Sequence, residues 1–261
     1  TSTVLICAAS VSDADLETLT PTYTWMNGST TLGTGTTLTL TSSLAQPSDS
    51  ISCVASVTDG YGASAELSNS VSVDNTAPVV DSVSISPATT YNDSTVSCSA
   101  VVSDADNQSL TTTYEWQNST TGVNLGTGSS VTLDSSLASR NDVLICTATV
   151  TDSSGDTATS SVSQTLDNRA PSMSGVYLNP ALAYVDSTLS CSESGSDLDG
   201  DSVTYSYAWS VNGGATVGTS TTLSGAFVAG DTVVCSVTPN DGLVDGSGST
   251  ASIVISNSIP S

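Results

Sequence analysis

Residues 93–151 read DSTVSCSAVVSDADNQSLTTTYEWQNSTTGVNLGTGSSVTLDSSLASRNDVLICTATVT, and this stretch decides the fold. It contains two cysteines with a tryptophan between them, and the same framework recurs on both sides. Its three copies use every cysteine and every tryptophan of the chain: Cys7, Trp25, Cys53, Cys98, Trp116, Cys146, Cys191, Trp209 and Cys235. A pattern that returns three times at a nearly constant spacing predicts a tandem array of one structural unit.

The spacing of the framework matches one small β-sandwich domain of about 100 residues. We therefore divide the chain into repeat one (residues 1–77), repeat two (78–170) and repeat three (171–261). Asn-Thr-Ala-Pro at 75–78, Asn-Arg-Ala-Pro at 168–171 and Asn-Ser-Ile-Pro at 257–260 mark the boundaries. These boundaries are too short for flexible linkers, and proline stiffens each one. The repeats are expected to form a semi-rigid rod.

Apolar and polar residues alternate along much of the chain, and no helical periodicity of useful length is present. The pattern predicts an all-β fold. In repeat two the expected strands are 78–87, 95–102, 111–117, 129–133, 143–151 and 157–166, and the segment 125–128 is expected to be a turn. The dipeptides Asn27-Gly28 and Asn212-Gly213 predict tight hairpin turns in the other two repeats.

Repeat one lacks the opening strand that residues 78–87 supply in repeat two. A sandwich without this strand exposes backbone groups and the edge of its core. The sequence therefore predicts a longer array. We favour a parent chain that continues upstream and supplies the strand, and the alternative is a strand inserted by a neighbouring subunit. Further repeats of the same chain, or identical subunits head to tail, are the expected partners.

One cysteine pair per repeat predicts three disulfides: Cys7–Cys53, Cys98–Cys146 and Cys191–Cys235. Such bridges persist in oxidising compartments, so an extracellular or cell-surface location is expected. Buried free thiols are the alternative interpretation. Zinc binding is disfavoured, because the sequence contains no histidine and no Cys-x-x-Cys pair.

The chain is strongly acidic, with 25 acidic residues against two basic ones and a net charge of −23. Nucleic-acid binding is excluded, because the phosphates require cations that this sequence lacks. Adsorption to an anionic membrane is disfavoured for the same reason, and no apolar run is long enough to span a bilayer. The catalytic inventory is poor, with no histidine or lysine to act as a base, so we do not expect an enzyme.

The order of cysteine, tryptophan and cysteine on successive expected strands resembles the immunoglobulin fold over the whole chain. Together with the Asp-x-Asp loops and the Asp-Asn-x-Ala-Pro boundaries, it is similar to the tandem immunoglobulin-like and cadherin-like repeats of large bacterial extracellular surface and fibre proteins. The resemblance implies three immunoglobulin-like β-sandwiches in a rod. The tyrosine of the immunoglobulin corner is missing, since its place is taken by Ile51, Leu144 and Val233, which favours a bacterial or archaeal module.

The loops after the first and second cysteine of each repeat are acidic, as in Asp13-Ala14-Asp15 of repeat one. In an immunoglobulin-like topology these loops meet the boundary that the preceding repeat delivers. Converging oxygen ligands are what Ca²⁺ requires, although solvated turns also favour aspartate. The candidate ligands are Asp74, Asn75, Asp104, Asp106, Asp152, Asp167, Asn168, Asp197, Asp199, Asp201 and Asp241.

Sequons for N-linked glycosylation occur at Asn27, Asn92, Asn107 and Asn118, and the high serine and threonine content also permits O-glycosylation. We expect a structural extracellular protein, a rod or fibril that is glycosylated and stiffened by Ca²⁺. The alternative is a cell-surface adhesin or carbohydrate-binding module. Repeat three, with Tyr205, Tyr207 and Phe227, is where a glycan-binding surface would be sought, although the tyrosines are better explained as sheet surface or core.

Overall fold

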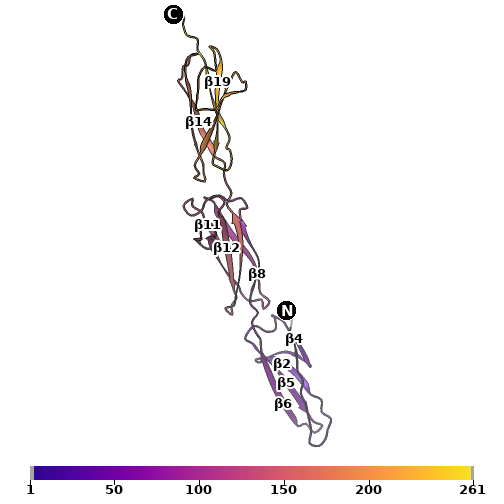
Figure 1. Ribbon diagram of the computed structural model, residues 1–261. Helices are drawn as coiled ribbons and strands as arrows, with labels where there is room; N and C mark the ends of the chain where they lie inside the picture. The colour runs from indigo at the N-terminus through magenta and orange to yellow at the C-terminus, as the bar shows by residue number, and fades with distance from the viewer. Residues whose placement is uncertain (1–2, 260–261) are drawn as a thin grey trace.

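The computed structural model describes residues 3–259, and every regular element in that range is a β-strand. The strands form three units placed end to end, with repeat one at one end of a rod and repeat three at the other (Figure 1). Each unit has a core of its own, and the three clusters of buried side chains share no residue. Residues 3–259 contain no helix that is long and apolar enough to cross a membrane.

Repeat two is a complete sandwich of two antiparallel sheets. The sheets have the strand orders β10-β9-β12-β13 and β11-β8-β7. Strand β12 faces the other sheet with its alternate residues, which are buried. The strands are β7 Val79–Ser86, β8 Thr95–Ser103, β9 Thr111–Asn118, β10 Val123–Thr127, β11 Ser130–Thr132, β12 Val143–Thr151 and β13 Thr157–Thr165. This topology is that of an immunoglobulin-like sandwich.

The six strands predicted for repeat two are present with nearly the predicted ends. The expected turn at 125–128 is wrong, because most of it belongs to β10, which pairs with β9. The pairing register shifts between Asn124 and Gly126, and the Asn124 side chain accepts the Gly126 N–H at 2.8 Å. Such a bulge interrupts the alternation that identifies a strand in sequence.

Repeat three has the same plan, with sheets ordered β17-β16-β19-β20 and β14-β15-β18. Asn212 and Gly213 both adopt positive φ angles, 51° and 71°, as the predicted hairpin turn requires. The strands are β14 Ser172–Asn179, β15 Leu189–Ser196, β16 Thr204–Val211, β17 Thr216–Gly218, β18 Thr222–Leu223, β19 Thr232–Asn240 and β20 Ser249–Val254.

Repeat one differs from the other two on one side of the sandwich. Its larger sheet is complete, with the order β3-β2-β5-β6, but the facing sheet consists of β1 and β4 alone. The strands are β1 Thr3–Ile6, β2 Thr22–Asn27, β3 Thr30–Thr34, β4 Thr37–Leu40, β5 Ser50–Thr58 and β6 Ser64–Ser72. All residues of β6 are exposed, whereas its counterpart β13 alternates between exposed and half-buried residues.

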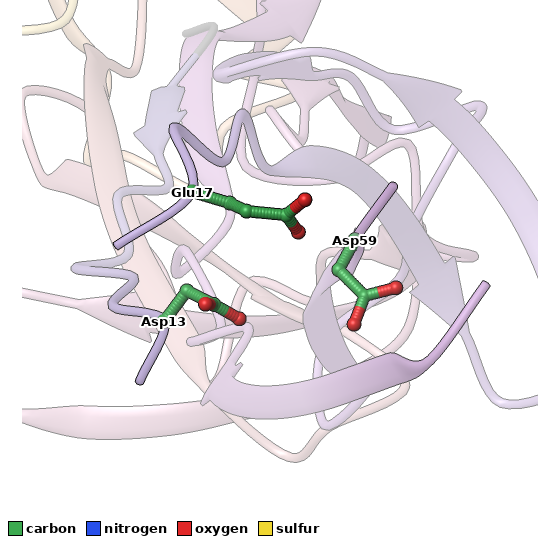
Figure 2. A group of neighbouring side chains, drawn as sticks. All are labelled: Asp13, Glu17 and Asp59. Atoms are coloured by element: carbon green, nitrogen blue, oxygen red, sulfur yellow. The ribbon is translucent and has the colours of Figure 1, made fainter. Parts of the chain in front are cut away.

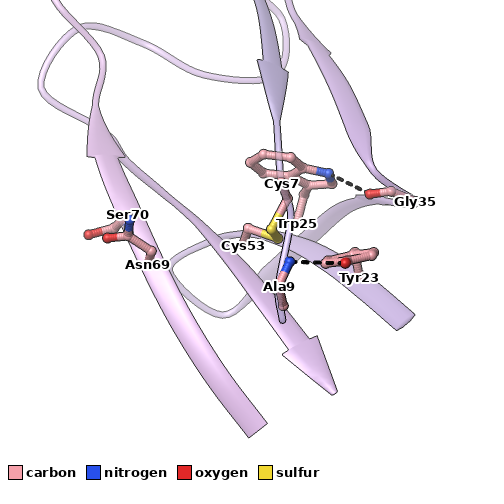
Figure 3. Close-up of a disulfide and its surroundings, with 8 residues drawn as sticks. All are labelled: Cys7, Ala9, Tyr23, Trp25, Gly35, Cys53, Asn69 and Ser70. Atoms are coloured by element: carbon pink, nitrogen blue, oxygen red, sulfur yellow. Dashed lines mark hydrogen bonds between the residues drawn. A yellow bond between two sulfur atoms is a disulfide. The ribbon is translucent and has the colours of Figure 1, made fainter. Parts of the chain in front are cut away.

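The cysteines and the tryptophan lie at the centre of each sandwich. The three predicted disulfides, Cys7–Cys53, Cys98–Cys146 and Cys191–Cys235, are present and connect the two sheets. All three tryptophans are buried, and each indole N–H donates to a backbone carbonyl, as a buried tryptophan generally requires. Figure 3 shows this arrangement in repeat one, where Trp25 Nε1 donates to the Gly35 carbonyl at 3.0 Å.

Candidate cation-binding junctions between repeats

The first junction joins repeat one to repeat two through residues 74–77. Asn75 Nδ2 donates to Asp152 Oδ2 at 2.8 Å and to Asp156 Oδ2 at 2.7 Å, and both acceptors lie in the loop between β12 and β13. The Thr76 N–H donates to Asp106 Oδ2 at 2.7 Å, in the loop between β8 and β9. The boundary segment and both acidic loops therefore meet at one place, as the sequence predicted.

Each of the two loops is shaped by an aspartate that binds its own backbone. Asp104 Oδ1 accepts the N–H groups of Asp106 and Gln108 at 2.8 and 3.2 Å. Asp152 Oδ1 accepts those of Ser154 and Asp156, both at 2.9 Å. Aspartate favours such turns because its short side chain reaches the backbone two residues further on. In both aspartates one carboxylate oxygen is occupied by the loop, and the second is directed elsewhere.

Three buried oxygens of this junction have no hydrogen-bond partner among residues 3–259. They are Asn75 Oδ1, Asp104 Oδ2 and Gln108 Oε1. A buried acceptor without a partner is costly, and an ion is one of the few ways to satisfy several of them at once. The three oxygens come from the boundary segment and from one loop of repeat two.

The second junction repeats this arrangement one domain further along. Asn168 Nδ2 donates to Asp241 Oδ2 at 2.8 Å, and the Arg169 N–H donates to Asp199 Oδ2 at 2.6 Å. The buried oxygens without a hydrogen-bond partner are again at the equivalent positions, Asn168 Oδ1, Asp197 Oδ2 and Asp201 Oδ2. Oxygens of Asp197, Asp199 and Asp201 lie within 4.8 Å of one another. Two junctions of different sequence thus leave the same two positions open, the boundary asparagine and the first aspartate of the loop, whereas Asp201 Oδ2 at the third position lies 2.6 Å from Arg140 Nε.

Both cationic side chains of the chain lie at the second junction. Arg169 contacts Asp199 Oδ1 through Nε at 2.8 Å and Asp93 Oδ1 through Nη2 at 2.5 Å, and its guanidinium lies 4.5 Å from the centre of the Tyr91 ring. Arg140 Nε lies 2.6 Å from Asp201 Oδ2, a charge pair without hydrogen-bond alignment. The bond to Asp93 is the main reason why the pKa of Arg169 is raised.

The junction carboxylates are held in their ionised form. The hydrogen bond from Asn75 lowers the pKa of Asp152 below its ordinary value, against the opposing effect of burial. Burial alone would raise the pKa of Asp241, but hydrogen bonds from Asn168 and from its own loop, with the charge of Arg140, lower it to about 2. At neutral pH both carboxylates are therefore negatively charged.

The structure brings only part of the predicted ligand set together. Asp74 is exposed, and Asp167 is bound locally, with its Oδ2 accepting the Thr90 N–H at 3.0 Å. Successive residues of an extended segment point in opposite directions, so only one residue of each Asp-Asn pair can face the loops. Gln108 was missed because it is uncharged. The sequence could have indicated Gln108 by its position, because it lies as far after Cys98 as Asp201 lies after Cys191.

Repeat one carries a related cluster at its outer end. Asp13, Glu17 and Asp59 bring carboxylate oxygens within 4.8 Å of one another. Figure 2 shows the three side chains gathered at this place. These residues occupy the positions of Asp104, Gln108 and Asp152 relative to their cysteines. The Gly60 N–H donates to Glu17 Oε2 at 3.3 Å, and Asp59 Oδ1 accepts the N–H groups of its own loop. The outer end of repeat one therefore carries side-chain oxygens at the positions that face the preceding repeat in repeats two and three.

Two of the four sequons have a buried asparagine. Asn118 is fully buried, and its amide donates to the Leu137 carbonyl and to Asp142. Asn92 is 1% exposed, and its amide donates to the Asp199 carbonyl at 2.7 Å. A glycan on either nitrogen would require the folded contacts to open. Asn27 is half-buried with its amide bound to Asp49, whereas Asn107 lies exposed in a loop.

The two tyrosines of repeat three belong to its packing. Tyr205 and Tyr207 contact the buried core of that repeat. The Tyr207 hydroxyl donates to Glu193 Oε2 at 2.6 Å, and burial, followed by this neighbouring carboxylate, raises the pKa of Tyr207 to about 12. They therefore fill the role of core residues, which was the better explanation from sequence.

No family model and no curated protein matches the sequence. Among solved structures, the chain is similar to the three N-terminal domains of the bacteriophage RB49 highly immunogenic outer capsid protein, with 17% identity over 98% of this chain and 94% of that chain and a TM-score of 0.31. The chain is also similar to a structure of a 1.5-MDa bacterial ice-binding adhesin, with 17% identity over 98% of this chain and 90% of that chain and a TM-score of 0.36. A third similar structure contains the protocadherin gamma B2 extracellular cadherin domains 3–6, with 14% identity over 98% of this chain and 78% of that chain and a TM-score of 0.35. Tandem extracellular domains are thus among the structures similar to this chain.

Proposed function

We propose that this chain is a rigid extracellular spacer, a rod of immunoglobulin-like repeats whose junctions are stiffened by Ca²⁺. The observation that carries the proposal is that the boundary asparagine and the first aspartate of the facing loop each leave a buried oxygen without a partner at both junctions. All of the ligands are carboxylate or amide oxygens, which suit a hard cation, and flexible loops suit Ca²⁺ better than Mg²⁺. The disulfide in each repeat fits an oxidising extracellular environment.

At the first junction the ion would be held by Asn75, Asp104 and Gln108, and at the second by Asn168, Asp197 and Asp201. In both cases one ligand comes from the preceding repeat. Binding would therefore fasten two domains to each other. Ca²⁺ takes roughly six to eight oxygen ligands, so water would complete each coordination shell.

Calorimetric titration with Ca²⁺ tests the proposal, with the variants Asp104→Asn and Asp197→Asn. Each variant keeps the Oδ1 acceptor that shapes the loop. Each replaces the unpartnered Oδ2 with an amide nitrogen, which cannot bind a cation. Each variant should lose one binding equivalent. Asp81→Asn is the matched control, because Asp81 is an exposed aspartate of β7 and its loss changes the net charge equally. Unchanged stoichiometry in both junction variants would refute the sites.

The rod itself would continue through partners of the same kind. We propose further repeats, or identical subunits head to tail, because repeat one presents Asp13, Glu17 and Asp59 at the junction positions. At the opposite end, Asn257 stands at the position of Asn75 and Asn168. The same rod would also suit the stalk of a cell-surface adhesin. Negative-stain microscopy of native material distinguishes continuous filaments from stalks that carry a distal head.

We propose Asn107 as the N-glycosylation site that best fits the folded chain, because it is exposed in the loop between β8 and β9. Intact-mass measurement of native protein and of an Asn107→Gln variant tests this assignment. A glycan mass that persists in the variant would place the modification elsewhere, for example on serine or threonine.

A further inference from the structure

The outer face of the smaller sheet in repeat three carries an aromatic ring. Among residues 3–259, the four other tyrosines of the strands pack on the cores of their repeats: Tyr23, Tyr114, Tyr205 and Tyr207. Tyr177 of β14 instead turns outward and is 59% exposed. It lies opposite Ser192 in the pairing of β14 with β15, and its neighbour Leu178 packs on the core. Within the described range, repeat three alone presents an aromatic ring on a sheet face.

The ring of Tyr177 is folded along β14 over Gly175. The glycine lies two residues before the tyrosine and therefore on the same face, opposite Ser194. A Cβ atom at Gly175 would lie 2.7 Å from Tyr177 Cζ and 2.9 Å from its Cε2, so only glycine leaves room for the ring. Because the strand already holds the ring in place, a ligand that contacts it has little side-chain freedom to remove.

The surroundings of the ring are hydroxyl groups without charge. Ser174 Oγ donates to Ser194 Oγ at 2.9 Å, whereas the exposed Ser192, opposite the ring, makes no side-chain hydrogen bond among residues 3–259. The one charged residue of β14 and β15 is Glu193, and it faces the interior, where the Tyr207 hydroxyl donates to it at 2.6 Å. This face is therefore neutral in a chain whose net charge is −23.

The equivalent face of repeat two lacks both features. Ser84 of β7 stands at the position of Tyr177, and its hydroxyl is hydrogen-bonded to that of Ser99 at 2.9 Å. Ser82 stands at the position of Gly175, so a tyrosine could not fold onto this strand in the same way. The two repeats share one plan, so the sandwich itself does not require the ring.

We infer that the outer face of β14 and β15 is a binding site for a neutral saccharide of the β-glucoside type. A pyranose ring with equatorial hydroxyls presents C–H groups on its flat faces and hydroxyls around its edge. The C–H face stacks on the Tyr177 ring, which is apolar in its body and polar only at its tip. The edge exchanges hydrogen bonds with Ser192 and its neighbours, because a serine hydroxyl both donates and accepts.

Other classes of occupant suit this face less well. An anionic ligand is repelled by the charge of the chain, and the face offers no cation to bind it. A protein partner needs roughly 800 Å² on each side, with apolar anchors at the centre, whereas here one ring stands among serines. The inference is independent of the proposed cation sites, since none of their ligands belongs to β14 or β15.

NMR titration of residues 1–261 with cellotetraose tests the inference, in the presence of EDTA so that cation binding plays no part. We expect saturable chemical-shift changes confined to β14 and β15 and centred on Tyr177 and Ser192, with a Kd on the order of 1 mM. Sorbitol offers similar hydroxyls without a ring. It is the matched ligand control and should cause no saturable change.

Three chain variants identify the group that binds. Tyr177→Ser introduces the residue of repeat two and should weaken binding at least about tenfold, because the stacking surface is lost. Tyr177→Phe keeps the ring and should bind within about threefold of the parent chain. Tyr61→Ser removes the other exposed tyrosine, which lies in a loop of repeat one, and should change nothing.

The inference is overturned if cellotetraose causes no saturable change, if sorbitol acts equally, or if Tyr177→Ser binds as the parent chain does. It is also overturned if the shifts of Tyr177 follow protein concentration and cellotetraose fails to compete, because a second copy of the chain would then occupy the face.

Discussion

The two junctions use the same loops but are held together by different means. The second junction contains both arginines of the chain, and the segment 90–93 of repeat two also reaches it through Asn92 and Asp93. At the first junction Thr76 and Pro47 stand at the positions of Arg169 and Arg140. Its contacts are hydrogen bonds from Asn75 and Thr76 to three aspartates, Asp106, Asp152 and Asp156, and no cationic side chain takes part among residues 3–259. The comparison teaches that one junction carries its own counter-charge, whereas the other has none among residues 3–259.

The charges of the open oxygens support this view. Gln108 at the first junction is replaced by Asp201 at the second, which adds one negative charge, and Arg140 beside Asp201 offsets it. The second set of oxygens, counted together with Arg140, therefore carries the same net charge as the first. The second junction differs in having a guanidinium within reach of a ligand, which competes with a cation for the same oxygen.

The largest effect is expected from Arg169→Thr, which gives the second junction the residue of the first. Asp199 is buried, with its side chain 1% exposed, and would lose its charged partner. Breaking such a buried pair costs about 3–5 kcal/mol. Hydrogen exchange and proteolysis at residues 167–171 should then resemble those at 74–78. Arg169→Lys keeps the charge without the planar contacts and should give an intermediate result. Wild-type protection in Arg169→Thr would break the comparison.

Removing Ca²⁺ should loosen the first junction more than the second. At a hundredfold excess of ion over its Kd, binding contributes about 2.7 kcal/mol to the docked state, and a chelator removes this contribution. Hydrogen exchange of segments 74–77 and 167–170, measured with and without chelator, compares the two junctions in one sample. An equal change, or a larger one at the second junction, would contradict the proposed difference.

Acid should open the second junction only well below the ordinary pKa of aspartate. The folded pKa of Asp241 is lowered to about 2, so its contribution to stability is fully present above about pH 4. It is lost as the pH falls through 2, when the carboxylate that accepts from Asn168 becomes protonated. Small-angle scattering from pH 5 to 2 should show bending late in the titration. Opening that is complete by pH 4 would argue against this hydrogen-bonded carboxylate.

The smallest effect is expected from Arg140→Gln. This change frees Asp201 from its charge pair and should tighten Ca²⁺ binding at the second junction by on the order of 1 kcal/mol, since Arg140 is partly exposed and solvent screens the pair. Calorimetry in the Asp104→Asn background isolates the second site. Weaker binding in the double variant would mean that Arg140 positions Asp201 for the ion.

Much of the architecture was predictable because it recurs. The cysteines, the tryptophans and the alternating strands stand in register in three repeats, so one complete repeat identifies the others. The junction was predictable only in outline. Asp74 and Asn75 are adjacent in sequence and both suit a cation, but strand geometry directs one of them away. Gln108 became visible only through its unpartnered buried oxygen, and Asn118 resembles a sequon although its amide is used inside the fold.

The disulfides also determine how the rod responds when it is pulled along its axis. In repeat two the bridge closes a segment of 48 residues, Cys98 to Cys146, and the segments outside it are the ones that transmit tension from its neighbours. Under load β7 and β13 can peel away, but the closed segment cannot unravel while the bridge is intact. At about 3.4 Å per extended residue, each bridge withholds roughly 160 Å of chain. A stretched rod therefore lengthens by short steps of limited size, and in every repeat the segment closed by the disulfide cannot be pulled out to its full length.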